Sequence, residues 1–213
     1  MKTRKIRTAL YNVLPGEKAH ALMAPRPKYI EGIEGVHPCP PVNSAILALI
    51  VPFENELALP LIKRVNRGKS HGGQIAFPGG KMVQDDADGL QPALRECHEE
   101  IGVPEEKVSI LGVLSDIYIP LSNFNITPIV GTTLQLPDFI LSQDEVEKVI
   151  LVKLRDLFDD RNKTTHSFVR HDHKIIAPGY KIGENFIWGA TAMIIAELEQ
   201  LMKTNTFNHL GKL

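Results

Sequence analysis

Cysteines and long apolar runs are both scarce in this chain of 213 residues, and each absence excludes a class of protein. The two cysteines, Cys39 and Cys97, are too few for the disulfide framework of a secreted domain, so a reducing cytoplasm is the expected compartment. No stretch approaches the roughly 18–20 apolar residues that a membrane-spanning helix needs, so no membrane partner is expected. The basic N-terminus lacks the apolar run and the small-residue cleavage site of a signal peptide.

The chain also has no large excess of positive or negative charge. The 24 Lys and Arg residues nearly cancel the 25 Asp and Glu residues, which leaves a formal net charge of −1. Such a chain has no overall field that attracts nucleic acid or an anionic membrane, so nucleic acid is not an expected partner. Any attraction for phosphate groups must therefore be local.

The chain divides into an N-terminal extension, residues 1–42, and a main domain, residues 43–213. Residues 1–23 are predicted to form one or two short helices, broken at Pro15 and Gly16. Residues 24–42 contain five prolines, which resist helix formation, so this stretch is predicted to be an extended connector.

The main domain is predicted to have an α+β fold in which a mixed sheet packs between helices. Apolar runs predict strands at residues 45–51, 57–64, 108–113, 125–132 and 146–152. A polar turn at residues 54–56 joins the first two strands, and a glycine-rich loop follows over residues 68–80. Helices are predicted at residues 91–101, capped by Gly102, and at residues 190–203, with a hairpin between residues 167 and 176.

Three glutamates share one face of the predicted helix at residues 91–101. Glu96, Glu99 and Glu100 stand at positions i, i+3 and i+4. Their carboxylates repel one another, and a hard divalent cation would relieve the repulsion because Mg²⁺ prefers oxygen ligands. On its own, the cluster is better explained as a solvated acidic face. The preceding Gly79–Gly80 pair favours a metal site, because glycines permit the close approach of a backbone carbonyl.

Residues 80–103 resemble the Nudix box, whose pattern is G-x5-E-x7-R-E-U-x-E-E-x-G-U, where U is a bulky apolar residue. The second half matches at each fixed position. In the first half, counting back from Arg95 gives Ala87 in place of the glutamate, whereas counting forward from Gly80 gives Asp86, followed by eight residues instead of seven. Asp86 is therefore the predicted replacement. The resemblance implies a Nudix-type α/β/α sandwich with a mixed central sheet.

The resemblance also implies a role for each matched residue. The implied ligands of Mg²⁺ or Mn²⁺ are the Gly79 carbonyl and the carboxylates of Glu96, Glu99 and Glu100. The implied catalytic residues are Glu96, Glu99 and Arg95. Glu96 would orient or deprotonate the attacking water, while Arg95 would hold the helix by pairing with a carboxylate, with Asp86 as the expected partner.

The implied reaction is attack by water on one phosphorus of a diphosphate, without a covalent enzyme intermediate. Divalent cations neutralise the diphosphate oxygens and lower the pKa of bound water. No motif indicates a nucleophilic serine or cysteine, and Cys97 is interpreted as a buried apolar residue beside Leu94 on the helix. Glu145 and Glu147 are both candidates for a base outside the box, and their spacing does not decide between them.

Residues 64–80 resemble a motif of the coenzyme A pyrophosphatase branch of the Nudix family. The matching positions are Arg64, Lys69, His71, Gly73 and Gln74. Val65 departs from that pattern, since a serine or alanine is usual there. The implied substrate-binding residues are Arg64, Arg67, Lys69 and His71. Their positive charge suits the 3′-phosphate of coenzyme A. The alternatives are solvated loop side chains and, for His71, a structural loop residue.

The leading prediction is an enzyme, a Nudix diphosphatase that cleaves coenzyme A or acyl-CoA to 3′,5′-ADP and (acyl-)4′-phosphopantetheine. The alternative substrate is ADP-ribose or another nucleoside diphosphate derivative. The alternative class is a ligand-sensing module without catalysis, although such a protein should have lost the three carboxylates that this helix retains. A homodimer is left open. Trp188 is interpreted as a core residue in preference to one that stacks on a base.

Overall fold

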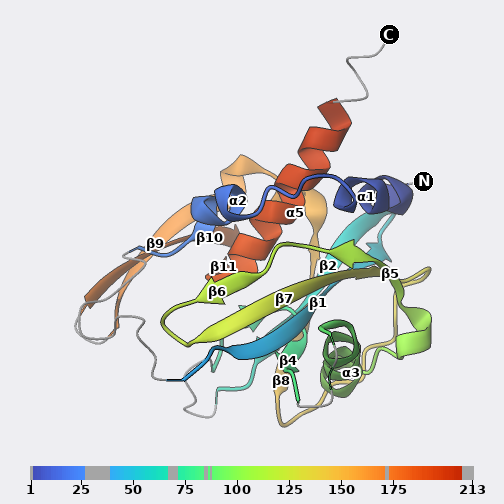
Figure 1. Ribbon diagram of the computed structural model, residues 1–213, viewed down its shortest axis with the longest axis horizontal. Helices are drawn as coiled ribbons and strands as arrows, with labels where there is room; N and C mark the ends of the chain where they lie inside the picture. Colours follow the sequence, from blue (N-terminus) through green and yellow to red (C-terminus); the bar gives the residue numbers. More distant parts are fainter. Residues whose placement is uncertain are drawn as a thin grey trace.

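The computed structural model describes residues 2–26, 39–66, 72–83, 86, 88–170 and 173–207. A mixed β-sheet lies between helices on its two faces (Figure 1), so the predicted α+β class and the α/β/α sandwich are confirmed. Most of the predicted connector, residues 27–38, lies outside the described residues.

The large sheet has eight strands in the described part of the chain, and the strand predicted at residues 45–51 lies at its centre as β1. The strands are β1 (Val42–Phe53), β2 (Glu56–Arg64), β3 (Ile75–Ala76), β4 (Gly79–Lys81), β5 (Ser109–Val113), β6 (Ile117–Ile119), β7 (Phe124–Thr132) and β8 (Val146–Lys153). Strands β1 and β7 are parallel, and the other pairs are antiparallel. The predicted turn between β1 and β2 is present, with positive φ angles at Glu54 and Asn55 that suit a tight hairpin.

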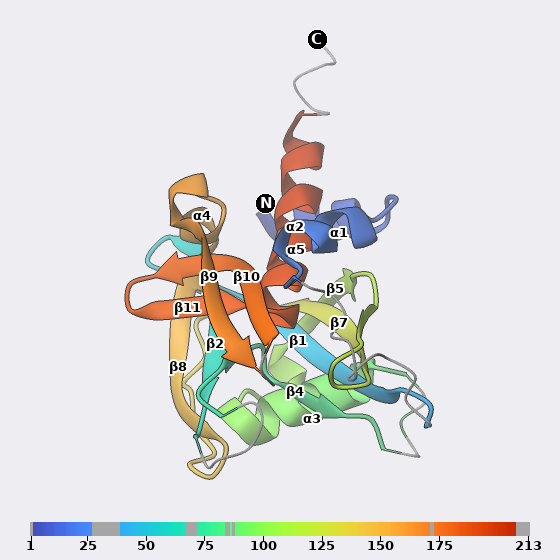
Figure 2. The same cartoon turned by 90° about the vertical axis from the view of Figure 1, so that its left-hand side faces the viewer.

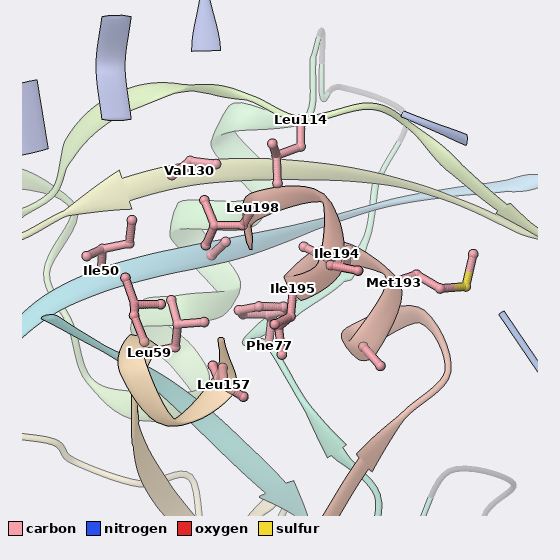
Figure 3. Close-up of a cluster of buried hydrophobic side chains, with 14 of the residues drawn as sticks. Ile50, Leu59, Phe77, Leu114, Val130, Leu157, Met193, Ile194, Ile195 and Leu198 are labelled. Atoms are coloured by element: carbon pink, nitrogen blue, oxygen red, sulfur yellow. The ribbon is translucent and has the colours of Figure 1, made fainter. Parts of the chain in front are cut away.

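Helices cover both faces of this sheet (Figures 1 and 2). Helix α3 (Leu90–Ile101) packs Ala93, Cys97 and Ile101 against one face. Helix α5 (Ala190–Phe207) packs on the other face and is apolar on most sides, as expected of a helix that is buried all round. Figure 3 shows this second core, which includes Ile50, Leu59, Val130, Ile194, Ile195 and Leu198.

The N-terminal helices pack onto the same face as α5. Helices α1 (Lys2–Leu10) and α2 (Glu17–Met23) are separated at the Pro15–Gly16 break that the sequence predicts. Their buried residues join the core around α5 and are Ile6, Ala9, Leu10, Ala19 and Met23. Glu197 on α5 fixes the junction, because its carboxylate accepts hydrogen bonds from the Gly16 N–H at 3.0 Å and the Ser115 hydroxyl at 2.6 Å and lies 2.8 Å from His20 Nε2.

A second sheet of three strands stands beside α5. Its strands are β9 (Lys163–Arg170), β10 (His173–Ile182) and β11 (Asn185–Trp188). The predicted hairpin is therefore present and is longer than expected, although its turn at residues 171–172 lies outside the described residues. The short elements are α4 (Leu154–Leu157), η1 (Glu105–Lys107) and η2 (Asp160–Asn162). Within the described part of the chain, no helix has the length and apolar character needed to cross a membrane.

Candidate active site

Strand β4 brings a glycine pair against both β1 and α3. Gly79 is paired with Ile46 of β1, and a Cβ at Gly79 would lie 2.4 Å from the Ala45 carbonyl oxygen. A Cβ at Gly80 would lie 2.3 Å from the carboxyl carbon of Glu96. A side chain at Gly79 would therefore clash with the backbone of β1, and the Glu96 carboxylate lies directly against the backbone of Gly80.

Glu100 is held inside the protein by two groups. Its side chain is 1% exposed, and its carboxylate accepts a hydrogen bond from the Gly79 N–H at 2.9 Å. Arg64 Nη2 lies 3.1 Å from the other carboxylate oxygen and donates to the Gly79 carbonyl at 3.0 Å. Burial raises the pKa of Glu100 to about 7, Arg64 and the Gly79 N–H oppose this rise, and nearby Glu96 and Glu145 add to it.

Arg95 connects Glu96 to the segment before the helix. Its Nη1 lies 3.2 Å from Glu96 Oε1, and its Nη2 lies 3.4 Å from Asp86 Oδ2. Asp86 also accepts a hydrogen bond from the Val83 N–H at 2.7 Å, so the contact expected between Asp86 and Arg95 is present. Burial raises the pKa of Glu96, Arg95 lowers it, and the charges of Glu99 and Glu145 raise it further.

The carboxylates that meet at the cavity are not the three that share one face of the helix. Glu96 and Glu100 line a cavity together with Glu145, which precedes β8, whereas Glu99 is exposed and is not among the residues that line it. The Val65 N–H donates to the Glu145 carbonyl at 2.9 Å and fixes the position of that turn. Glu147 instead pairs with Lys63 at 2.7 Å. Of the two candidate bases, only Glu145 faces this cavity.

The donor set suits a hard divalent cation. Among the residues that the structure describes, no three His, Cys, Asp or Glu side chains form a complete metal site by themselves. Carboxylate oxygens from α3 and the carbonyl of Gly79 are nevertheless the ligand types that Mg²⁺ prefers. The Gly79 carbonyl accepts from Arg64 with one lone pair, which leaves a second lone pair for a ligand bond.

The structure describes only one of the four predicted substrate-binding residues. Arg64 lines the cavity, but its guanidinium group is already engaged by Glu100 and Gly79. Arg67, Lys69 and His71 lie outside the described residues.

Cys97 was interpreted as a packing residue, and that interpretation is confirmed. Its side chain is fully buried in the core beneath α3. Burial raises the pKa of the Cys97 thiol to about 12, and the nearby charge of Glu100 adds to this effect. The thiol is therefore protonated at neutral pH and is not a nucleophile.

The cavity has a volume of about 1110 Å³, and two parts of its wall contrast in character, while residues between Tyr118 and Ile126 supply a third part of the lining. The charged wall comes from the glycine loop, α3 and the turn before β8. The apolar wall comes from the second sheet, the start of α5 and the segment after α2; its residues are Ala24, Pro25, Phe168, Ile175, Trp188 and Met193. The prediction of a core position for Trp188 was wrong, because this half-buried ring lines the cavity beside Phe168.

Comparison with known proteins agrees with this geometry. Residues 43–171 match the NUDIX domain family model. The chain is 34% identical over 161 residues to a protein of Enterobacter sp. (strain 638) named uncharacterized Nudix hydrolase NudL, with 74% of this chain and 82% of that protein covered. It is 33% identical over 159 residues to the protein of that name from Yersinia pestis (strain Pestoides F), with 72% and 77% covered.

Solved structures of low sequence identity share the fold. A NUDIX hydrolase from Nitrosomonas europaea superposes with a TM-score of 0.51 at 20% identity, covering 82% of this chain and 76% of that one. The Nudix hydrolase RenU from M. smegmatis superposes with a TM-score of 0.50 at 13% identity, covering 82% and 90%. The family match and the relatives at 33–34% identity, together with the glycine loop packed on an acidic helix, show that the chain belongs to the Nudix hydrolase family.

Proposed function

We propose that this Nudix hydrolase cleaves the diphosphate linkage of coenzyme A or acyl-CoA and releases 3′,5′-ADP and (acyl-)4′-phosphopantetheine. The observation that carries the proposal is the cavity, which joins the carboxylates of Glu96 and Glu100 to an apolar wall in one space of about 1110 Å³. Ligand pockets commonly measure about 300–1,000 Å³, so this cavity suits a large substrate with both a charged and an apolar part. The resemblance of residues 64–80 to the coenzyme A branch supports the same choice.

Each residue of the site has a separate role in the proposed reaction. Glu96, Glu100 and the Gly79 carbonyl line the cavity and would hold Mg²⁺ or Mn²⁺, with Glu99 as the predicted ligand on the neighbouring exposed face of α3. The cation would supply charge neutralisation for the diphosphate oxygens and lower the pKa of water. Arg95 holds Glu96 against Gly80, where its carboxylate can orient the attacking water. Glu145 faces the same cavity and can accept the proton of that water. Water attacks one phosphorus, and the bond from that phosphorus to the bridging oxygen breaks.

Arg64 has a positioning role in this proposal. Its guanidinium group joins the carboxylate of Glu100 to the carbonyl of Gly79, and so fixes the helix relative to the glycine loop. A misplacement of about 1 Å at a reacting group can lower a rate about 100-fold, so this connection affects catalysis without contact to the reacting atoms.

The test is hydrolysis of matched substrates. The purified protein is incubated with Mg²⁺ or Mn²⁺ and with coenzyme A, dephospho-coenzyme A or ADP-ribose, and the products are identified by mass spectrometry. We expect the highest kcat/KM for coenzyme A, with ¹⁸O from labelled water in one phosphate product. A higher kcat/KM for ADP-ribose would contradict the coenzyme A assignment. Binding of these ligands with no turnover under either metal would indicate a sensing module instead.

A further inference from the structure

We propose that the apolar wall of the cavity binds a hydrocarbon portion of the substrate's non-nucleotide arm, and that the segment after α2 completes this wall. The inference rests on the proposed function, because the arm is the part of the diphosphate ester on the far side of the cleaved linkage. It assigns a binding role to residues that come from outside the glycine loop and the acidic helix.

The second sheet presents one apolar face to the cavity. Phe168 of β9 stands directly opposite Ile175 of β10, and both line the cavity. The neighbouring Val169 and Ile176 are 71% and 42% exposed, as expected where successive side chains of a strand point to opposite faces. Trp188 of β11 meets Phe168 edge to face, with ring centroids 4.8 Å apart. Phe168, Ile175 and Trp188 therefore form an apolar patch on the face turned toward the cavity.

The segment after α2 adds to this surface and is fixed at both ends. Ala24 and Pro25 line the cavity. On one side of them, Arg26 forms two backbone hydrogen bonds with Ile176 of β10, at 2.8 and 2.7 Å. On the other side, His20 of α2 lies 2.8 Å from the buried carboxylate of Glu197. These connections make the N-terminal segment a fixed part of the cavity wall.

The uncharged side chains of this wall favour an apolar ligand. Its six side chains carry no charge, and the neighbouring Thr191 hydroxyl already donates to the Ile75 carbonyl at 3.1 Å. A sugar or a second phosphate placed there would lose hydrogen bonds to water without replacement, which is unfavourable. An aliphatic chain loses none and gains from burial. The wall also shares one cavity with Glu96 and Glu100, so a chain that starts at the diphosphate can reach it.

Alkyl esters of ADP test the inference without any part of pantetheine. Methyl, butyl and octyl esters keep the same nucleoside diphosphate and differ only in the length of the apolar chain. We expect kcat/KM to rise with chain length, by up to about fourfold per buried methylene. Calorimetric Kd values for the corresponding esters of α,β-methylene-ADP, which resist hydrolysis, should show the same trend.

Substitutions in the apolar wall test whether the dependence on chain length arises there. Phe168→Ala and Ala24→Asp should flatten the dependence on chain length through KM, with little change for the methyl ester. Val169→Ala on the same strand and Leu22→Asp on α2 are the matched controls, since Val169 and Leu22 are 71% and 56% exposed, and both should keep the dependence. Circular dichroism establishes that each variant is folded.

Two outcomes would overturn the inference: Kd values that do not change with chain length, or an equal loss of methyl and octyl ester binding in Phe168→Ala, which would assign the wall to the nucleoside. Neither result would contradict the proposed hydrolysis of coenzyme A. Conversely, failure to hydrolyse coenzyme A together with tighter binding of longer esters would refute the proposed function alone.

Discussion

The Glu96 carboxylate occupies the space that a side chain on Gly80 would need, since a Cβ there would lie 2.3 Å from the Glu96 carboxyl carbon. Gly80→Ala should therefore displace Glu96 and lower kcat about 100-fold. Because the displaced group is the end of a flexible side chain, we expect the free energy of unfolding to change by less than about 1 kcal/mol. Steady-state kinetics and urea unfolding measure the two effects.

Gly183→Ala is the complementary control for that experiment. Gly183 has a φ of 57° in the turn before β11, and nothing lies within 4 Å of its Cβ position. Alanine there should reduce stability by about 1 kcal/mol through backbone strain and leave kcat unchanged. Equal losses of activity in the two variants would contradict a specific role for the contact between Gly80 and Glu96.

Arg64→Met should destabilise the protein, because it leaves the buried carboxylate of Glu100 without its cation. Loss of one partner of a fully buried ion pair costs about 3–5 kcal/mol, and the partial exposure of Arg64 reduces the expected loss to about 2 kcal/mol. Lys63→Met removes the neighbouring exposed pair with Glu147 and should change stability by less than about 1 kcal/mol. Urea unfolding at neutral pH compares them, and equal losses in the two variants would refute the assignment.

Glu145→Gln should lower kcat by about 100-fold or more, since general bases contribute roughly 10²–10⁴ to the rate. Glu145 is exposed toward the cavity, so the fold should be unaffected. Glu147→Gln is the matched control two residues later and should retain near-normal turnover. The kcat of both variants is measured at neutral pH with coenzyme A and Mg²⁺. A full-rate Glu145→Gln enzyme would exclude Glu145 as the base.

Alkylation should distinguish the two cysteines. Cys39 is exposed, whereas Cys97 is buried and has its pKa raised to about 12. Iodoacetamide at pH 8 should therefore label Cys39 and leave Cys97 unmodified in the folded protein, as peptide mass spectrometry can determine. Cys97→Ser should remain active in its folded fraction. Loss of turnover in a folded Cys97→Ser protein would contradict the packing role.

Hydrophobic periodicity predicted the long helices and strands because their apolar residues recur at a regular spacing. The helix expected at residues 91–101 is found at Leu90–Ile101, and the strand expected at residues 57–64 is found at Glu56–Arg64. Strands β3, β4, β6 and β11 were missed, since segments of two to four residues are too short to carry a period.

The sequence named Glu145 and Glu147 as candidate bases but could not decide between them, and the reason for this is different. Glu145 enters the cavity only because β8 pairs with β2, and pairing between distant strands leaves no trace in local spacing. The same holds for Phe168 and Trp188, whose shared position depends on the register of β9, β10 and β11. The contact of Asp86 with Arg95 was predictable because both residues belong to one motif of fixed spacing.

The hydrogen bond from Gly16 to Glu197 joins residues 181 positions apart, and the bridge from Arg26 to Ile176 closes a loop of similar length. Such non-local contacts form late, because the entropy of closing a long loop must be overcome before the contacts stabilise it. During synthesis, α2 precedes α5 and cannot dock until Glu197 has been made. The part of the cavity wall that comes from Ala24 and Pro25 therefore depends on the synthesis of α5.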